Sequence, residues 1–246
     1  VFAVVGMINA INLIDGVDGL SSGFCMIASI AFGVLFIMTD NYDMAVLTAI
    51  TMGSLMPFFF HNVFGDRSKM FIGDGGSLMM GVAMSTYVVA VISVRDEAFD
   101  AMPDGMGLVA FTMAVMAVPV FDTLRVMTMR ILRRTSPFRP DKTHLHHLFI
   151  DLGFSHIATT LSVLSLNLLV VLAWLISYLA GASVDVQFYV VIVSSVLVTA
   201  IFYKVMRMQM ACNGILARAM RKMAARSHYQ ERTAWKRLQR IMDKRS

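Results

Sequence analysis

Residues 20–39 have the sequence LSSGFCMIASIAFGVLFIMT, twenty consecutive positions without a charged side chain. A helix needs about 20 mostly apolar residues to cross the hydrocarbon core of a bilayer. Similar runs recur along the chain, and the charged residues are concentrated in short patches between them. The pattern predicts six membrane-spanning helices, at approximately 20–39, 45–64, 77–94, 106–125, 160–181 and 187–206.

The composition agrees with this interpretation, since 57% of the residues are hydrophobic and 15% are charged. A soluble domain usually carries about 25% charged residues. Residues 1–13 look like the end of one further span, and the start shows no basic region or cleavage site of a signal peptide. We therefore expect a fragment of an all-α polytopic membrane protein, with six full transmembrane helices and the end of a seventh.

The distribution of Lys and Arg predicts the topology, because short cytoplasmic loops carry an excess of basic residues. When alternate loops are assigned to the same side, and Arg125 and Lys204 at their span ends are counted with it, that side holds 20 of the 21 basic residues and the other holds only Arg95. The first side is predicted to be cytoplasmic. We expect residues 1–206 to form a transmembrane domain and residues 207–246 a basic cytoplasmic tail.

The tail interleaves its basic residues with apolar ones, and residues 204–246 contain 12 Lys or Arg. This pattern is typical of an amphipathic helix on anionic headgroups, where each basic residue contributes about 1 kcal/mol. We favour membrane lipids over nucleic acid as its partner, because basic tails are common on this side of a membrane. Cys25 and Cys212, the only cysteines, predict neither a disulfide framework nor a zinc site.

The first polar cluster, residues 9–20 (NAINLIDGVDGL), emerges directly from an apolar run. Asn12, Asp15 and Asp18 recur at intervals of three residues, so on a helical end they line one face. Ionisable groups this close to a bilayer are costly, which favours a functional role. The alternative is that the two aspartates simply mark the water interface.

The second cluster, residues 69–77 (KMFIGDGGS), runs into the span that begins near Leu78. A glycine-rich turn before a helix offers unpaired backbone N–H groups to an anion, here around Gly75 and Gly76. Asp74 could hold a divalent cation that also touches phosphate, since Mg²⁺ is often bound by one or two carboxylates. Taken alone, Gly-Asp-Gly is also an ordinary turn.

The third cluster, residues 136–147 (SPFRPDKTHLHH), contains three of the six histidines. No cysteine is nearby and no HExxH spacing is present, which argues against zinc. Arg139 and Lys142 together with the histidines indicate a site for a polyanion such as a diphosphate. A plain basic loop would explain the arginines but not the clustered histidines.

These three clusters are predicted to lie at one membrane face. Acids for a metal, a glycine turn for phosphate and cations for a diphosphate suit phosphoryl transfer to or from a lipid. Asp122, near the end of its span beside Arg125, is predicted to form a local salt bridge or a helix-end contact rather than to act in catalysis.

The three motifs, in this order and spacing, resemble signatures of the polyprenyl-phosphate N-acetylhexosamine-1-phosphate transferases, or glycosyltransferase family 4. The resemblance is strong from Val1 to about Phe154. The branch that acts on UDP-N-acetylmuramoyl-pentapeptide usually shows three consecutive histidines. The His-Leu-His-His pattern here is similar to the branch that uses UDP-N-acetylglucosamine and undecaprenyl phosphate.

This resemblance implies a phosphoglycosyltransferase of the bacterial inner membrane, with its site facing the cytoplasm and with Mg²⁺ or Mn²⁺ as cofactor. The product would be undecaprenyl-diphosphate-GlcNAc with release of UMP, the first step of O-antigen or enterobacterial common antigen synthesis. A homodimer is compatible with it. The family also carries an adjacent aspartate pair on an earlier loop, and no such pair occurs here, so we expect the fragment to be inactive alone.

The resemblance and the clusters together give the predicted site residues. The catalytic set is Asp15, Asp18, His144, His146 and His147, the substrate-binding set is Asn12, Arg139, Lys142, Gly75 and Gly76, and the metal ligands are Asp74 and Asn12.

Two other functions fit a membrane protein with polar clusters. A secondary transporter places its acids near the midplane, often in interrupted helices, whereas the acids here lie at predicted span ends. A non-catalytic scaffold would use the basic tail to recruit partners.

Overall fold

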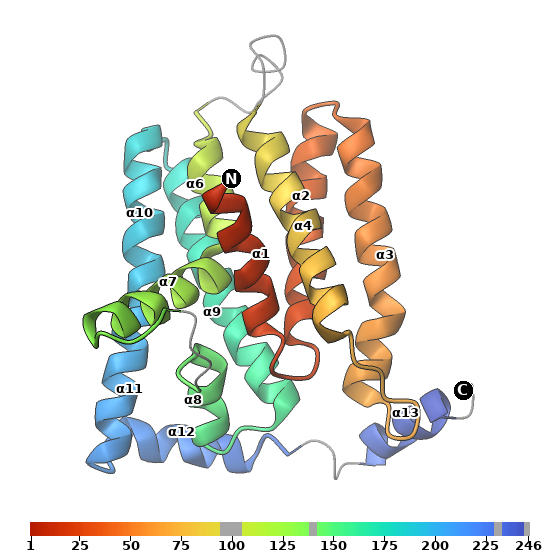
Figure 1. Cartoon of the computed structure of the whole chain (residues 1–246), viewed down its shortest axis with the longest axis vertical. Helices are drawn as coiled ribbons and strands as arrows, with labels where there is room; N and C mark the ends of the chain where they lie inside the picture. Colours follow the sequence, from red (N-terminus) through yellow and green to blue (C-terminus); the bar gives the residue numbers. More distant parts are fainter. Residues whose placement is uncertain (94–104, 138–141, 229–232, 244–246) are drawn as a thin grey trace.

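The computed structural model describes residues 1–93, 105–137, 142–228 and 233–243. Every regular element within these ranges is a helix, and most helices run side by side in one bundle (Figure 1). The predicted all-α polytopic fold is confirmed. The helices are α1 (Phe2–Ile14), α2 (Leu20–Met38), α3 (Tyr42–Phe64), α4 (Gly73–Ile92), α6 (Leu108–Val115), α7 (Ala117–Leu132), α8 (Leu145–Asp151), α9 (His156–Leu179), α10 (Val184–Val196), the π-helical turn η1 (Leu197–Ile201), α11 (Phe202–Ala211), α12 (Ile215–Ala225) and α13 (Thr233–Asp243).

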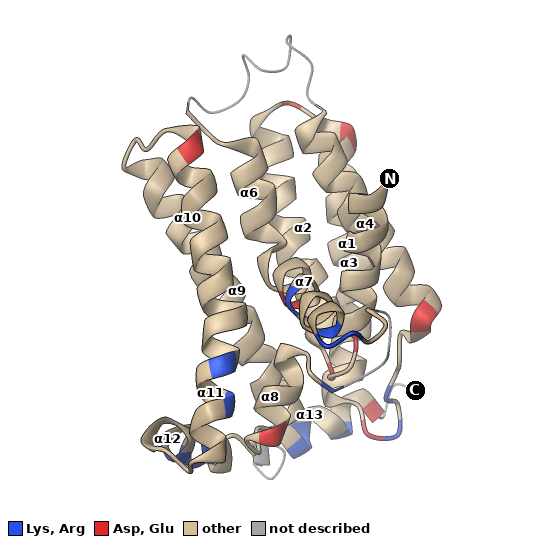
Figure 2. Ribbon diagram, turned by 60° about the vertical axis from the view of Figure 1, so that its left-hand side comes forward, with Lys and Arg blue, Asp and Glu red and all other residues tan. Residues whose placement is uncertain are grey.

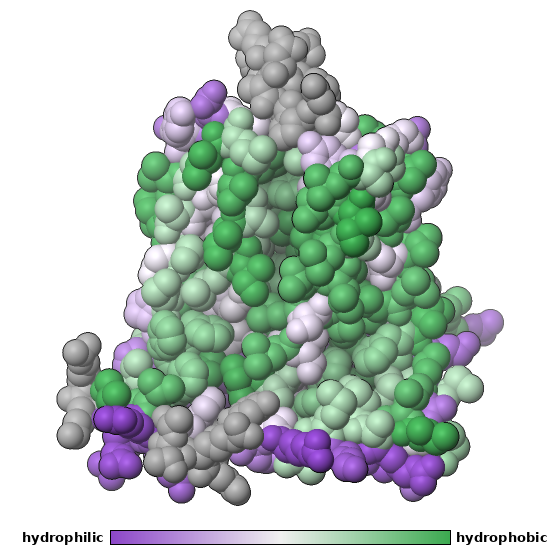
Figure 3. Space-filling model, turned by 180° about the vertical axis from the view of Figure 1, so that it is seen from behind, coloured by the Kyte–Doolittle hydropathy of each residue, from purple (hydrophilic) through white to green (hydrophobic). Residues whose placement is uncertain are grey.

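Five of the described helices are long and apolar enough to cross a membrane, or six if the bent pair of α6 and α7 counts as one span. The five are α2, α3, α4, α9 and the continuous helix over Val184–Ala211, with mean hydropathies between 1.5 and 2.1. Their outer faces carry exposed apolar side chains, which form most of the wall of the bundle in Figure 3. An apolar wall of this extent is typical of a surface that contacts lipid. The chain is a multi-pass membrane protein.

The span predicted at 106–125 is divided into two helices, α6 and α7, which meet at an angle of 76°. Pro119 in the first turn of α7 has no N–H to donate, so the helical ladder is interrupted there. Asn167 of α9 supplies the missing partners: its side chain accepts from the Val118 N–H at 2.8 Å and donates to the Val115 carbonyl at 3.0 Å. Backbone groups freed inside a membrane need such partners. As a result α7 runs across the bundle instead of along it (Figure 1).

Helix α1 contains the start of the first aspartate motif and helix α4 contains the end of the second. The two helices pack closely against each other. A Cβ atom placed on Gly81 of α4 would lie 2.7 Å from the Cα of Ile8, so only glycine permits this approach. Small residues allow such close contact between helices in membranes. The packing therefore brings the end of α1 beside the start of α4.

The loops with the three predicted clusters gather at one end of the bundle. We call this the basic end, and it is formed by the segments 15–19 and 65–72 together with α8, α12 and α13. Figure 2 shows the described Lys and Arg residues in this half of the molecule. The prediction that the polar clusters share one end is confirmed, and which side of the membrane this end faces remains a prediction.

The basic tail is more structured than the sequence predicted. The last span continues to Ala211 instead of ending near residue 206, and two short helices follow it. On α12, Ile215 and Met223 are 75% and 59% exposed, which agrees with an amphipathic helix. On α13, the Trp235 ring packs against Phe64 of α3 with 4.6 Å between the ring centroids. The tail therefore packs on the bundle at its basic end.

Candidate active site

The turn between α1 and α2 carries the two aspartates of the first motif. Because α1 ends at Ile14, Asp15 and Asp18 lie in this turn, and only Asn12 is part of the helix. The prediction that all three share a helical face is therefore wrong. Gly19 ends the turn at φ +76°, a left-handed conformation that favours glycine, so the second glycine of the motif serves to start α2.

Asp15 is a half-buried carboxylate that faces the second motif. Burial raises its pKa, a hydrogen bond from the Ser21 hydroxyl acts in the opposite direction, and the charge of Asp74 raises the pKa further. Asp15 and Asp74, 59 positions apart in the sequence, are therefore close enough to repel each other. Two carboxylates that repel across a gap form a setting in which a cation lowers the energy.

Asp18 is held by groups from two other parts of the chain. Lys69 Nζ lies 2.7 Å from its Oδ2 atom, and His156 Nδ1 lies 2.9 Å from the same atom. The Thr160 hydroxyl donates to the Asp18 carbonyl at 2.8 Å. These contacts tie the aspartate turn to the 65–72 segment on one side and to the start of α9 on the other.

Asn62, at the end of α3, is a binding partner that the sequence interpretation missed. Its side chain accepts from the Gly19 N–H at 2.6 Å and donates to the Met70 carbonyl at 2.7 Å. It is buried and fixes the aspartate turn relative to the segment that leads into the second motif. The only sequence signal was a carboxamide near the end of an apolar, aromatic-rich span.

The second motif lies in the first turn of α4, because this helix begins at Gly73 and not near Leu78 as predicted. Gly75 and Gly76 are thus helical, and within the described part of the chain no side chain caps the amides at this end. Such amides, with the helix dipole behind them, favour an anion. Asp74 is exposed at the same end. The Ser77 hydroxyl donates to Asn12 Oδ1 and joins the start of α4 to α1.

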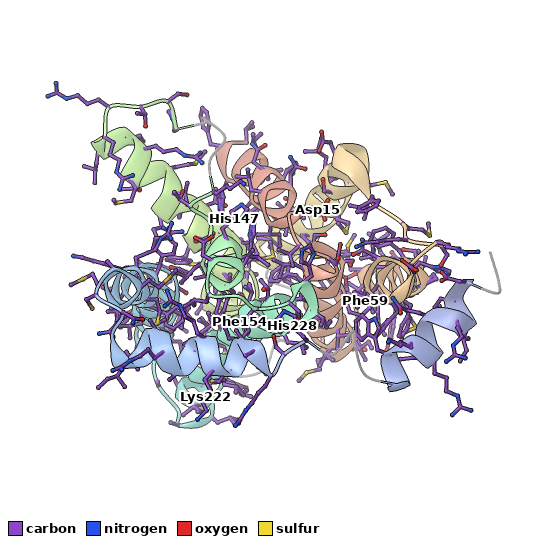
Figure 4. All side chains as sticks on the ribbon, turned by 90° about the horizontal axis from the view of Figure 1, so that it is seen from below. Asp15, Phe59, His147, Phe154, Lys222 and His228 are labelled. Carbon is purple, nitrogen blue, oxygen red and sulfur yellow. The ribbon has the colours of Figure 1, made fainter. Side chains whose placement is uncertain are left out.

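The histidine motif faces the aspartate turn. His144 and His146 are each 3% exposed, and His147 is half-buried (Figure 4). A Cβ atom on Gly16 would lie 2.8 Å from His146 Nε2, so the glycine lets the imidazole approach the turn. Burial, followed by the neighbouring His147 and His144, lowers the pKa of His146 to about 3. His146 is therefore neutral at pH 7, and the predicted role of the histidines as cations does not apply to it.

Asp122 holds the histidine motif from the side of α7. The predicted salt bridge to Arg125 is confirmed at 2.6 Å, with Asp122 buried and Arg125 partly buried. The other carboxylate oxygen, Oδ2, lies 3.0 Å from His144 Nδ1 and accepts from the Leu145 N–H at 3.0 Å. A carboxylate at Nδ1 fixes the ring so that Nε2 points away from it. His144 Nε2 is buried and has no hydrogen-bond partner among the described residues.

The two remaining predicted residues precede the histidines. Lys142 is exposed, one residue before Thr143, whose carbonyl accepts from Arg125 at 2.6 Å. Arg139 lies outside the described residues. The structure therefore brings together Asn12, Asp15, Asp18, Asp74 and the three histidines, with Lys142 on their approach.

Comparison with known proteins matches the first part of the chain to one family model. Residues 1–93 match the model of glycosyl transferase family 4. This stretch contains both aspartate motifs, and the resemblance predicted from them is confirmed. No solved structure matches the chain.

The curated relatives that match are named as N-acetylglucosamine phosphotransferases of polyprenyl phosphates. The decaprenyl-phosphate N-acetylglucosaminephosphotransferase of Mycolicibacterium smegmatis is 34% identical over 164 residues, which is 62% of this chain and 40% of that protein. The undecaprenyl-phosphate alpha-N-acetylglucosaminyl 1-phosphate transferase of Yersinia pestis is 30% identical over 156 residues, and that of Escherichia coli K12 is 28% identical over the same length. The chain covers 40% of the length of each of these relatives.

The donor atoms at the centre of this site suit a hard divalent cation. Asp15 and Asp74 offer carboxylate oxygens and Asn12 an amide oxygen, the ligand types that Mg²⁺ and Mn²⁺ prefer. The described residues contain no group of three or more His, Cys, Asp or Glu placed to hold a metal by themselves. Mg²⁺ often keeps several waters and binds through one or two carboxylates plus substrate phosphate, so this sparse donor set fits it.

Proposed function

We propose that this chain forms a large part of a phosphoglycosyltransferase. In this proposal the protein transfers GlcNAc-1-phosphate from UDP-GlcNAc to undecaprenyl phosphate and releases UMP. The observation that carries the proposal is the meeting of three distant motifs at the basic end. Lys69 pairs with Asp18, Ser77 bonds to Asn12, and Gly16 adjoins His146. The names of the relatives support the donor and acceptor classes.

The reaction requires an oxygen of the lipid phosphate to attack the phosphorus attached to the sugar. A new P–O bond forms, the bond from that phosphorus to the UMP oxygen breaks, and UMP carries away the electron pair. Because the lipid phosphate is already anionic at pH 7, little base catalysis is needed. The main barrier is the approach of two anions, and Mg²⁺ held by Asp74, Asn12 and Asp15 would offset their repulsion.

The residues of the chain would bind the donor and hold the site in place. The uncapped amides at the start of α4 would bind a phosphate of the donor. The neutral ring of His146, which adjoins the aspartate turn at Gly16, would line the donor site without adding charge. Asp18 is already paired with Lys69, and this pair would keep the aspartate turn, and with it Asp15, in place.

An apolar cavity beside the site supports a lipid acceptor. It has a volume of about 450 Å³ and lies between α1, α4, α6 and α7. Met7, Asn9, Val88, Met116 and Leu124 are among its lining residues, and Asn9 belongs to the first motif. The break between α6 and α7 shapes this cavity, because α7 crosses the bundle below α6. A polyprenyl chain in it would place its phosphate near the aspartate turn.

We infer that the basic end faces the cytoplasm of a bacterial inner membrane. The excess of Lys and Arg at this end supports that orientation. It also agrees with a nucleotide-sugar donor, which is a cytoplasmic metabolite. Labelling of a cysteine introduced at the exposed Asp74 should occur from the cytoplasmic side only.

A transporter is the second candidate, because the broken helix at α6 and α7 and the buried Asp122 are features of ion pathways. However, Asp122 is already paired with Arg125 and His144, which leaves no carboxylate oxygen open to an ion. The transferase is therefore the better supported function.

The proposal is tested by UMP release from several UDP-sugars by the full-length protein with undecaprenyl phosphate and Mg²⁺. We expect release from UDP-GlcNAc, and we expect Asp74→Asn to lower it by at least about a hundredfold, as for the loss of a group that stabilises the transition state. Asp185→Asn, at the opposite end of the bundle, is the matched control and should leave the rate unchanged. Failure of the wild-type protein to release UMP from any sugar would rule out the assignment.

A further inference from the structure

The segment after the last span crosses the basic end and touches both sides of the candidate site. We call residues 212–243 the strap, of which 212–228 and 233–243 are described. Figure 4 views this end from below, with α12 and its Lys222 on one side and α13 beyond Phe59 on the other. Just after α8, the helix that follows His144, the Ser155 hydroxyl donates to the Ser227 carbonyl at 2.8 Å.

The far end of the strap, α13, is fixed to α3. Trp235 is 8% exposed and its ring packs on Phe64. Rings in this arrangement contribute about 0.5–1.5 kcal/mol beyond the area they bury. The contact sets the position of α13, so that its last residue reaches the 65–72 segment.

Asp243 ends α13 and receives the amides of that segment. Its Oδ1 atom accepts from the Asp66 N–H at 3.3 Å, from the Ser68 N–H at 3.1 Å and from the Ser68 hydroxyl at 2.9 Å. These bonds lower the pKa of Asp243, so the carboxylate is ionised throughout the neutral range. The 65–72 segment has no regular helix of its own, and Asp243 supplies several of its hydrogen bonds.

Lys69, the residue after Ser68, forms the ion pair with Asp18 of the candidate site. Lys69 Nζ lies 2.7 Å from Asp18 and 5.4 Å from the centre of the Phe71 ring. A lysine side chain is long and flexible, so its position depends on the backbone that carries it. The contacts therefore form a continuous path from Asp243 through Ser68 and Lys69 to Asp18.

We propose that Asp243 is a positioning residue of the transferase, which clamps the 65–72 segment so that Lys69 stays on Asp18. This inference rests on the proposed function. Without the clamp, the segment would open more often, as do segments with few packed contacts and exposed hydrogen bonds. Lys69 would then leave Asp18, and the Asp18 carboxylate would keep only His156 of its two side-chain partners.

The contact itself is tested by amide hydrogen exchange of the full-length protein in lipid nanodiscs. Asp243→Ala should speed exchange at Asp66 and Ser68 by about tenfold or more, the effect of losing a charge-assisted bond. Arg240→Ala, on the exposed side of the same helix, is the matched control and should leave exchange unchanged. Equal exchange in Asp243→Ala and wild type would overturn the clamp, whatever the protein's activity.

The positioning role is tested by UMP release in a double-mutant cycle with Lys69→Met. Asp243→Ala should lower kcat about tenfold in the wild-type background and less than about twofold in the Lys69→Met background. Asp243→Asn, whose amide oxygen still accepts, should restore most of the rate. Equal losses in both backgrounds would overturn the positioning role. If the wild-type protein releases no UMP, the proposed function fails, and exchange still decides the clamp.

Discussion

The two sides of the site are held by ion pairs in different surroundings. On the side of α7, the side chains of Asp122 and Arg125 are 2% and 10% exposed. On the side of the 65–72 segment, the side chains of Asp18 and Lys69 are 17% and 31% exposed. A buried pair that loses one partner leaves an uncompensated charge, whereas an exposed pair contributes little to stability. The ion pair that holds the histidine motif is thus costly to break, whereas the ion pair that holds Asp18 costs less.

The largest expected effect on stability is that of Asp122→Ala. The substitution removes the carboxylate that pairs with Arg125. We expect it to lower the free energy of unfolding by about 3–5 kcal/mol, because the charge of Arg125 is then left uncompensated. It also frees the Leu145 amide and the His144 ring. Denaturant unfolding in detergent measures this. Asp151→Ala removes the exposed pair with Arg207 and should cost less than about 1 kcal/mol. Similar losses for both variants would contradict the comparison.

The next effect is that of Gly16→Ala, which places a methyl group 2.8 Å from His146 Nε2. The imidazole is buried and has little freedom to move away, so we expect a loss of about 1–3 kcal/mol together with a loss of UMP release. Gly53→Ala, where nothing lies within 4 Å of the new methyl group, is the control and should stabilise α3 by up to about 1 kcal/mol. A neutral Gly16→Ala would show that the two motifs do not meet as described.

Asn62→Ala sharpens the comparison on the weaker side. It removes the bonds to Gly19 and Met70, and a buried donor or acceptor left unpaired costs about 1–3 kcal/mol. Because both bonds hold loops and not helices, we expect UMP release to fall further than stability does. Thermal unfolding and the release assay on the same preparation measure both. A loss of stability with full activity would contradict this role.

The smallest expected effect on stability is that of Asp15→Asn, and it depends on pH. Burial raises its pKa above the ordinary value, so ionised Asp15 opposes folding at pH values above that raised pKa. Asp15→Asn should therefore stabilise the fold at pH 7 while abolishing UMP release. As the pH falls through the raised pKa towards 3.8, wild-type Asp15 becomes protonated and the stability difference should shrink. A variant less stable than the wild type at pH 7 would contradict the assigned environment.

The sequence predicted the membrane spans well, because hydropathy is a property of each run by itself. It did not reveal the break before Pro119, since the groups that make the break tolerable come from Asn167 on another helix. The three motifs were found as clusters of polar residues. How they are held was not, because Asn62 and Asp122 act on partners that only the fold brings near.

The spacing argument for the first motif failed for a local reason. An interval of three residues suggested one helical face for Asn12, Asp15 and Asp18. Instead, α1 stops at Ile14 and a turn with Gly19 at positive φ follows, so the two acids lie outside the helix. The glycines between them were the better signal, since glycine favours turns over helix interiors.

The central claim is that the motifs at the basic end form one phosphoryl-transfer site. The most direct test is to supply the full-length protein with UDP-GlcNAc that carries a radioactive label on the phosphorus next to the sugar, together with undecaprenyl phosphate and Mg²⁺. The account predicts that the label enters the lipid in equal amount to the UMP released, and that Asp74→Asn stops both. Sugar transfer that leaves the labelled phosphorus in the aqueous phase would contradict it.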